Sequence, residues 1–417
     1  MTGDEYWYED SGLRGFFENY GPELMGKMKG LFVSPEIVSG DLDQVISQIL
    51  SNIDGNKAFL ISGSTTQKYA KEVGEKLEEA GWDYRLWTSE KSEAPLQDVR
   101  KCGKEMREYG PDLIIPVGGG SRIDLAKMAW IKYEKPDVDL ADVSPMLLLG
   151  LREKAKMVVF PTTAGTGSEA TLAAVGADDS HDPPRKLEVA SLEIVPDYAA
   201  LVPKFTAGMP PSITAGTGLD ALTHAYDAYF SSLSRDITDF LSIKALKRIF
   251  EWLPKDYNNP DDMEARRMML EASTLAGLAF GNCNAALTHS LGHAVGKVFG
   301  IHHGAAVGMF IPSTLRFYSE VTDKHVDMAK KLGIEANSEE EYLDKLEKKF
   351  TDIMDEIDID YKLKEYDIDP KEWEENLDRI AGYAEEDICT LTSPRSTNKQ
   401  EMKEILKCAY DCRDVDF

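Results

Sequence analysis

Strand and helix patterns alternate in the first part of the chain, and this alternation restricts the fold more than any other feature. Compact apolar runs at residues 57–62, 82–87 and 112–117 predict buried strands. Helical spacing of apolar residues fills the intervals, at residues 69–81 and 95–109. Strands that are joined through helices run parallel, with right-handed crossovers. We therefore expect an α/β domain built on a parallel sheet.

A glycine-rich loop follows the third of these strands. Residues 118–121 read Gly-Gly-Gly-Ser, and we expect a helix to begin near Arg122. Glycines let the backbone approach a ligand closely, Ser121 can cap the helix, and the free N–H groups of the first turn attract an anion such as a pyrophosphate. A tight turn that binds nothing explains a triple glycine equally well, and the loop lacks the G-x-G-x-x-G pattern of an ordinary Rossmann fold.

A second loop of similar character follows the next predicted strand, at residues 158–161. Residues 162–169 read Thr-Thr-Ala-Gly-Thr-Gly-Ser-Glu, which offers hydroxyls and glycines to ribose, amide and phosphate oxygens. Two such loops at the ends of adjacent strands are typical of a dinucleotide crevice. Together the two loops favour nucleotide binding over a purely structural interpretation.

The pattern changes in the middle of the chain. We expect a hairpin around the turn at residues 179–184 and a strand at residues 192–195, after which helical periodicity dominates. A chain of 417 residues is long enough for two domains. We assign residues 1–205 to an α/β domain and residues 206–417 to a helical domain, with residues 1–30 as a packing or subunit-contact segment.

Five of the seven histidines lie within residues 220–304, beside an aspartate at helical spacing. They form two pairs at i, i+4 and one adjacent pair: Asp220 with His224, His289 with His293, and His302 with His303. Residues at i, i+4 share one face of a helix. One aspartate with two or more imidazoles suits Fe(II), Zn(II) or Co(II). Each pair alone is more commonly a surface ion pair or a core histidine, but their combination favours a metal site.

Composition excludes several classes of partner. The chain has 73 acidic and 47 basic residues, a formal net charge of −26, which repels nucleic acids and anionic membranes. Its five cysteines form no C-x-x-C pair, which favours reduced thiols. The N-terminus lacks the pattern of a signal peptide, and no apolar run reaches the roughly 18 residues of a membrane span. We expect a cytoplasmic protein.

Taken together, these motifs resemble those of the iron-containing (group III) alcohol dehydrogenase family. The resemblance extends over nearly the whole chain, in the order and spacing of the family. It rests on five segments: Gly118 to Lys127, Pro161 to Glu169, Thr217 to Ala225, His289 to Gly304, and Asp387 to Arg395.

The resemblance implies a Rossmann-like parallel-sheet domain for the dinucleotide and an all-helical metal-binding domain, with the active site in the cleft between them. By position, the metal ligands would be Asp220, His224, His289 and His303. His293 falls on the family's additional active-site histidine, and His302 matches no ligand position. The positions that would contact the cofactor are Gly63, Gly119, Gly120, Ser121, Asp124, Thr162, Thr163, Thr166, Lys186 and Ile213.

One departure from the family concerns the cofactor. Members that prefer NAD often carry Asp at the end of the first of these strands, where the carboxylate would repel a 2′-phosphate. This chain has Gly63 there, followed by Ser64, Thr65, Thr66 and Lys68. We therefore favour NADP(H) over NAD(H). The metal that the family implies is Fe(II), with Zn(II) as the alternative.

The resemblance implies a nicotinamide-dependent oxidoreductase that acts on the CH–OH group of a small alcohol, or on an aldehyde or ketone in reverse. The divalent ion would stabilise an alkoxide during hydride transfer. A homodimer or higher homo-oligomer is expected. The alternatives are a hydroxyacid-oxoacid transhydrogenase, a glycerol-dehydrogenase-like polyol oxidoreductase, and a dehydroquinate-synthase-like lyase, whose Glu and basic phosphate-binding residues the Asp220–His224 pattern does not supply. The substrate itself is left open.

Overall fold

The computed structural model describes residues 32–91, 94–178 and 185–417. The expectations for residues 1–30 and for the turn at 179–184 lie outside these ranges. Internal contacts divide the described chain into two compact units, one ending at Gly208 and one beginning at Met209. The sequence placed a boundary after residue 205, and that domain assignment stays a prediction.

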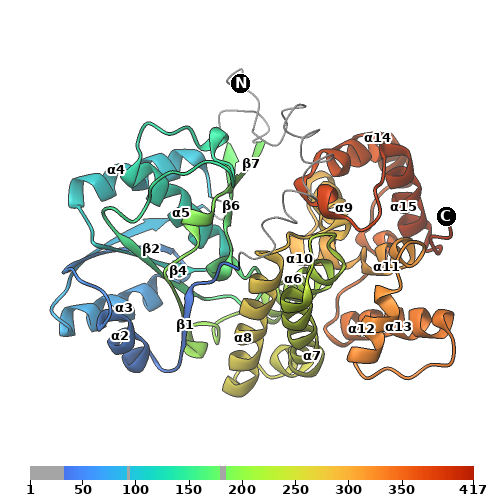
Figure 1. The fold of residues 1–417 in the computed structure, drawn as a ribbon, viewed down its shortest axis with the longest axis horizontal. Coiled ribbons are helices and arrows are strands. Elements are labelled where there is room, and N and C mark those ends of the chain that lie inside the picture. Colours follow the sequence, from blue (N-terminus) through green and yellow to red (C-terminus); the bar gives the residue numbers. More distant parts are fainter. Residues whose placement is uncertain (1–31, 92–93, 179–184) are drawn as a thin grey trace. The chain divides into compact units, whose positions relative to one another are not determined.

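The first unit contains a parallel sheet of six strands in the order β1-β8-β5-β4-β2-β3 (Figure 1). Its strands are β1 (Glu36–Ser39), β2 (Lys57–Gly63), β3 (Asp83–Ser89), β4 (Leu113–Gly118), β5 (Lys156–Pro161) and β8 (Tyr198–Leu201). Its helices are α2 (Leu42–Leu50), α3 (Gln67–Glu79), α4 (Leu96–Tyr109) and α5 (Gly120–Glu134). The predicted alternation from β2 to β5 is therefore confirmed. The sequence interpretation missed β1 and α2.

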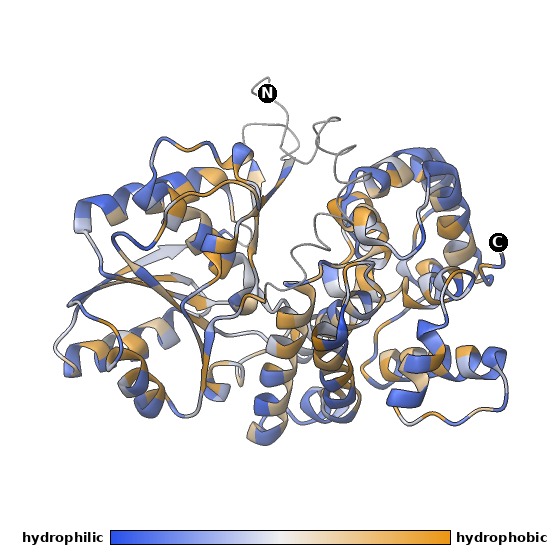
Figure 2. Cartoon of the chain, in the orientation of Figure 1, coloured by the Kyte–Doolittle hydropathy of each residue, from blue (hydrophilic) through white to orange (hydrophobic). Residues whose placement is uncertain are grey.

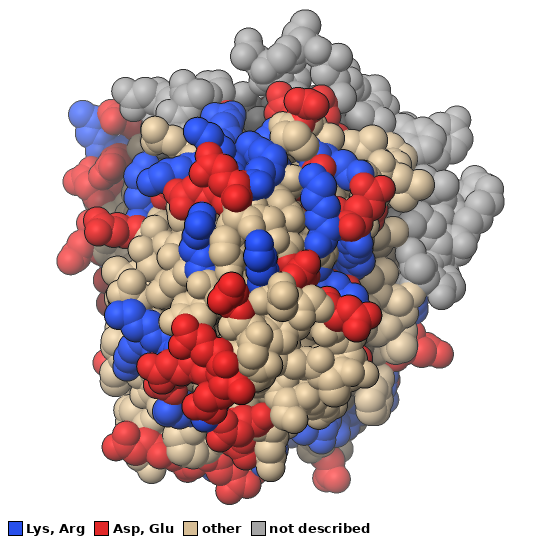
Figure 3. All heavy atoms as spheres, turned by 90° about the vertical axis from the view of Figure 1, so that its left-hand side faces the viewer, with Lys and Arg blue, Asp and Glu red and all other residues tan. Residues whose placement is uncertain are grey.

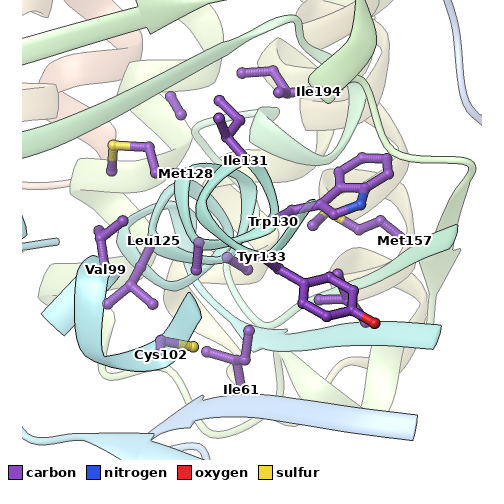
Figure 4. Close-up of a cluster of buried hydrophobic side chains, with 14 of the residues drawn as sticks. Ile61, Val99, Cys102, Leu125, Met128, Trp130, Ile131, Tyr133, Met157 and Ile194 are labelled. Atoms are coloured by element: carbon purple, nitrogen blue, oxygen red, sulfur yellow. The ribbon is translucent and has the colours of Figure 1, made fainter. Parts of the chain in front are cut away.

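The four inner strands β2, β4, β5 and β8 are buried on both faces, which explains why they read as continuous apolar runs. Phe59 and Ile61 of β2 join the cluster under α4 and α5. The alternate residues Ala58 and Leu60 join the cluster under α2 and α3. Figure 4 shows the first cluster around α5, with Trp130 and other apolar side chains of the helix facing their neighbours.

Two local predictions in this unit were wrong. Helix α5 begins at Gly120 with Gly119 as its N-cap, so Ser121 lies inside the first turn and caps nothing. The expected strand at 192–195 is instead a 3₁₀ helix, η3 (Leu192–Ile194). The Glu193 carboxylate accepts N–H groups of Leu149, Gly150 and Leu151, which holds this segment out of the sheet.

The hairpin that the sequence predicted is formed by β6 (Ala173–Asp178) and β7 (Arg185–Ala190). It lies beside α5. The fully buried Lys127 of α5 ties the helix to the chain that leads into this hairpin. Its Nζ donates hydrogen bonds to the carbonyl oxygens of Ser168 at 2.7 Å, Thr171 at 2.8 Å and Ala173 at 2.8 Å. A single ammonium group thus fixes the segment that follows the second glycine-rich loop.

The described part of the second unit is helical, as predicted. Its α-helices are α6 (Pro211–Phe230), α7 (Asp236–Asn258), α8 (Met263–Phe280), α9 (Leu287–Phe299), α10 (His303–Gly308), α11 (Ile311–Ser319), α12 (Lys324–Lys331), α13 (Glu339–Glu356), α14 (Pro370–Glu386) and α15 (Lys399–Asp411). Apolar and polar residues alternate on most of them (Figure 2), whereas α6 is buried on nearly all sides. Within the described ranges, no helix has the length and apolarity that a bilayer crossing needs.

Acidic and basic side chains share the surface of the first unit. Figure 3 shows one of its faces, on which Lys and Arg alternate with clusters of Asp and Glu. The net charge of −26 is thus compatible with local positive regions. A binding site for an anion therefore has to be judged from its own neighbours, because the total charge does not decide it.

We predict that Lys127→Met lowers the free energy of unfolding by about 3–5 kcal/mol at pH 7, because three carbonyl oxygens lose their donor. Burial lowers the pKa of Lys127 from 10.5 to about 8, against the opposing effect of Asp124 and Glu169. As pH rises, Lys127 therefore loses its proton at a lower pH in the folded protein than in the unfolded chain. Because the unfolded chain then binds more protons, the free energy of unfolding of the wild type increases as pH rises above 8. Between pH 7 and pH 9.5 the difference between wild type and variant should grow by about 2 kcal/mol in urea unfolding. A difference that is constant or shrinks contradicts this assignment.

Candidate functional site

Three imidazoles converge on one carboxylate oxygen in the helical unit. Asp220 and His224 come from α6, His289 from α9, and His303 from the start of α10. The distances to Asp220 Oδ1 are 3.2 Å from His303 Nε2, 3.7 Å from His224 Nδ1 and 3.9 Å from His289 Nε2. Asp220, His289 and His303 each offer a ligand atom within 4.8 Å of the others, a set to which His224 does not belong.

A close helix crossing brings His303 to this position. A Cβ atom at Gly304 would lie only 1.8 Å from the carbonyl oxygen of Gly216, so α10 and α6 touch through their backbones. His302 also packs against α6, where a Cβ at Gly216 would lie 2.4 Å from its ring. His302 is thereby placed against α6, while its neighbour His303 reaches Asp220. The two adjacent histidines have different surroundings because glycine permits this contact.

Asp227 orients His289. Its side chain is fully buried, and its Oδ2 accepts hydrogen bonds from His289 Nδ1 at 2.7 Å, from His289 N at 3.1 Å and from Ala286 N at 3.0 Å. With the proton held on Nδ1, the Nε2 atom of His289 is left with a lone pair toward Asp220. The sequence interpretation missed Asp227. Its position seven residues after Asp220 on the same helix was the signal available.

His293 has a matching partner. Its Nδ1 lies 2.7 Å from Asp387 Oδ2, and its ring is stacked at 5.2 Å on that of His303. Asp387 Oδ1 accepts hydrogen bonds from Cys389 N at 2.9 Å and Ser290 Oγ at 3.3 Å, so the carboxylate is itself fixed. Asp387 belongs to a segment that the sequence singled out without giving it a role. The dyad fixes the orientation of the His293 ring through its Nδ1 atom.

The chemistry of these donors fits a divalent cation. Within the described chain, Asp220 Oδ1 and His289 Nε2 are buried without a hydrogen bond that satisfies them, although such atoms are costly to leave unpaired. Burial alone would raise the pKa of Asp220, but the imidazoles of His224, His303 and His289 hold that pKa well below its usual range. The His224 ring is held between Phe280 at 4.0 Å and His289 at 4.5 Å. One carboxylate and neighbouring imidazoles are a donor set of the kind that Fe(II) or Zn(II) takes.

In the first unit, the two glycine-rich loops touch each other. Strands β4 and β5 are neighbours, with Gly118 opposite Pro161. A Cβ at Gly119 would lie 3.1 Å from Thr163, and a Cβ at Gly120 would lie 2.7 Å from Thr166. The glycines are therefore needed for this approach, which sets the N-terminus of α5 beside threonine hydroxyls. Such a place suits a phosphate group.

The remaining positions that the resemblance assigned to the cofactor are distributed as follows. Thr162 follows β5, and Ser121 is exposed in the first turn of α5. Asp124 accepts hydrogen bonds from Ser168 Oγ at 2.6 Å and Val175 N at 3.1 Å, so it ties the loop to β6. Gly63 ends β2, Lys186 lies on β7, and Ile213 lies in the first turn of α6, in the other unit.

A parallel sheet with two glycine-rich loops at its strand ends, and a helical unit with a donor set that fits a cation, are typical of a metal-dependent, nucleotide-using enzyme. Residues 35–203 match the family model for iron-containing alcohol dehydrogenase, and residues 214–410 match the C-terminal model of the Fe-containing alcohol dehydrogenase family. The chain belongs to the iron-containing alcohol dehydrogenase family. It is a nicotinamide-dependent alcohol dehydrogenase, an oxidoreductase that acts on CH–OH groups.

Individual relatives agree with this assignment. The chain is 37% identical over 383 residues to the NADPH-dependent butanol dehydrogenase of Clostridium saccharobutylicum, covering 91% of this chain and 96% of that protein. It is 33% identical over 353 residues to the aldehyde-alcohol dehydrogenase of Streptococcus pneumoniae serotype 4, covering 78% of this chain but only 39% of that protein. A crystal structure of a 1,3-propanediol oxidoreductase matches with a TM-score of 0.83 at 27% identity, over 91% of this chain and 99% of the other. The transhydrogenase, polyol and lyase alternatives are not favoured.

We predict that Asp227→Ala weakens divalent metal binding by about 10- to 100-fold, because His289 loses the hydrogen bond that fixes its ring. Asp227→Asn is the matched control, since an amide oxygen can replace the one oxygen that accepts all three hydrogen bonds. Titration of the metal-free protein with Co(II) against a chelator measures the affinity, and thermal unfolding of the metal-free proteins reports folding. Equal affinities for wild type and Ala variant would show that Asp227 does not support the ligand.

Proposed function

We propose that Asp220, His224, His289 and His303 together hold one catalytic divalent cation, Fe(II) in preference to Zn(II). The observation that carries this is the convergence of three imidazole nitrogens on Asp220 Oδ1, at 3.2, 3.7 and 3.9 Å. Asp227 presents the Nε2 atom of His289 to the same point. A cation bound there acts as a Lewis acid toward the oxygen of an alcohol or carbonyl substrate.

His293 is proposed to move the proton. Its ring lies 5.8 Å from that of His289 and 5.2 Å from that of His303, so it borders the ligand cluster. Asp387 fixes Nδ1, and Nε2 is then the atom that accepts the proton of an alcohol or donates one to a carbonyl oxygen. The same carboxylate stabilises the imidazolium form while it holds the proton. The family resemblance alone gave no reason for the choice of nitrogen.

The cofactor is proposed to be NADP(H), bound by the loops of the first unit. When bound, this cofactor would supply or accept the hydride of the reaction. The preference over NAD(H) is supported by Gly63, which places no carboxylate at the end of β2. It is also supported by the NADPH dependence named for the butanol dehydrogenase relative. Because that relative is named for butanol, short alcohols and their aldehydes are the substrates to test first.

Two coarser expectations are also proposals. The cysteines Cys102, Cys283, Cys389 and Cys408 are buried as free thiols, which supports a reducing compartment such as the cytoplasm. The second proposal is a homodimer or higher homo-oligomer, as the family resemblance implies. Size-exclusion chromatography with light scattering tests the second proposal, and a monomeric protein would remove it.

Substitution of the histidines separates the proposed ligands from the proposed proton carrier. We predict that His289→Ala loses bound metal and turnover together. His293→Ala should keep its metal content and lower kcat by about 10²- to 10⁴-fold, because only the proton carrier is lost. Metal analysis by mass spectrometry and kcat on a short alcohol are the two readouts. Full metal content in His289→Ala contradicts the ligand assignment, and His302→Ala, outside the cluster, should change neither quantity by much.

Substitution of Gly63 tests the cofactor preference. We predict that wild type has a higher kcat/KM with NADPH than with NADH, and that Gly63→Asp reverses the order. A Cβ at this position has room, since its nearest neighbours would lie 3.7 Å away, so the new carboxylate can act on the 2′-position without disturbing the fold. Initial rates of butanal reduction with each cofactor measure this. A clear preference of the wild type for NADH would remove the proposal.

A further inference from the structure

We propose that His293, Asp387 and Cys389 form a second cation site, and that a thiophilic divalent ion such as Zn(II) inhibits the enzyme by binding there. We call this set the thiol site. It shares no residue with the four proposed ligands of the catalytic cation. Its inhibitory effect rests on the proposed function, in which His293 carries the proton, whereas the binding rests only on residues of the helical unit.

The three side chains come from two segments that pack against each other. His293 lies on α9, Asp387 directly follows α14, and Cys389 lies in the 3₁₀ helix η6 (Ile388–Thr392), which contacts α9. Each offers one ligand atom within 4.8 Å of the other two. Within the described ranges, only this set and the set around Asp220 bring three histidine, cysteine or carboxylate side chains so close together.

Hydrogen bonds fix these donors in place. Thr390 Oγ1 donates to the carbonyl oxygen of Ala384 at 2.7 Å and lies 2.9 Å from Ser290 Oγ, so η6 is anchored to both α14 and α9. Asp387 Oδ1 accepts from Cys389 N, which leaves Oδ2 directed at His293 Nδ1 at 2.7 Å. The donors are thus positioned before an ion arrives, and binding adds little cost of ordering.

The thiol site is largely shielded from water but is not sealed. The side chains of His293 and Asp387 are 18% and 9% exposed, and Cys389 is 7% exposed. An ion can therefore reach His293 from solvent. Once it has entered, it meets few competing water molecules, which strengthens its attraction to the carboxylate and the thiolate.

The donor types determine which ion the thiol site takes. One sulfur, one imidazole nitrogen and one carboxylate oxygen suit Zn(II) and similar thiophilic ions, whereas Mg(II) or Ca(II) would need mostly oxygen. The set around Asp220 contains no sulfur. A divalent ion with one thiolate and one carboxylate also forms a neutral group. The two negative charges therefore offset the repulsion from a cation at Asp220, although the His293 and His303 rings are only 5.2 Å apart.

Binding at the thiol site changes the protonation of His293. The ion takes Nδ1, the nitrogen that faces Asp387, and the proton of that nitrogen moves to Nε2 through solvent. The Cys389 thiol coordinates as a thiolate, so its proton is released to solvent. Nε2 then has no lone pair for the proton of an alcohol, and giving up its own proton to a carbonyl substrate would leave an imidazolate. The proton carrier is blocked in both directions of the reaction.

Titration of the full-length, metal-free protein with Co(II) alone tests this inference. A thiolate ligand gives Co(II) an intense charge-transfer band in the near ultraviolet, and the proposed catalytic ligands include no thiolate. We expect the first equivalent to bind without this band. The second equivalent should produce the band, release about one proton, and lower kcat on butanol by about 10²-fold or more, as expected when a general acid–base group is lost.

Four variants identify the ligands. Loss of a partner outside the ligand shell already costs about 10- to 100-fold in metal affinity, so Cys389→Ser should lose the band and bind the second ion about 100-fold more weakly. His293→Ala should lose the band as well. Cys412→Ser, which removes an exposed free thiol of the same unit, is the matched control and should keep it. His289→Ala should lose the first ion and keep the band.

Several results would overturn the inference. The site is wrong if the wild type shows no thiolate band, if Cys389→Ser keeps the band, or if Cys412→Ser is the variant that loses it. A band that forms while kcat stays constant overturns the inhibitory role. Failure of the catalytic site gives a different result, because His289→Ala would then still bind two equivalents of Co(II).

Discussion

The burial of a single carboxylate governs the helical unit. Asp220 is 3% exposed, and a carboxylate in such surroundings is costly unless positive charge or strong donors compensate it. Three imidazoles surround it, and the rings of His224 and His289 are 4.5 Å apart. A divalent cation would compensate the buried carboxylate and accept the lone pairs of the ring nitrogens. The donor set is therefore of the kind that suits a cation site.

Two further carboxylates decide which nitrogen each histidine presents. Asp227 holds Nδ1 of His289, and Asp387 holds Nδ1 of His293, both at 2.7 Å. In each dyad the carboxylate also accepts backbone N–H groups, so its position does not depend on the histidine alone. The same arrangement fits the two proposed roles: in one dyad it would direct a lone pair to the metal site, and in the other it would orient the proton carrier.

The sequence predicted some features of this structure and could not predict others, for physical reasons. Periodicity and glycine loops located β2 to β5 and the helices around them, because local spacing carries that information. The short edge strand β1 was missed, since it owes its place to pairing with β8. The 3₁₀ helix η3 was misassigned as a strand, since its place depends on the long-range contacts of Glu193. The His289 and His293 pair was visible as helical spacing. Their partners Asp227 and Asp387 were not, because 62 and 94 residues separate the members of the two pairs.

The two units recognise their ligands by different means, and this difference explains where sequence reasoning reached its limit. The helical unit uses side chains, whose types are visible in the sequence. The sheet unit depends mainly on close backbone approach, which only glycine permits. A Cβ added at Gly120 would lie 2.7 Å from Thr166, and one added at Gly118 would lie 2.6 Å from Arg122. A glycine in a sequence does not say which neighbour needs the space. The loop Gly118 to Ser121 predicted a phosphate at the N-terminus of α5, but only the folded sheet shows that the stem of Arg122, from the same helix, lies beside the end of β2.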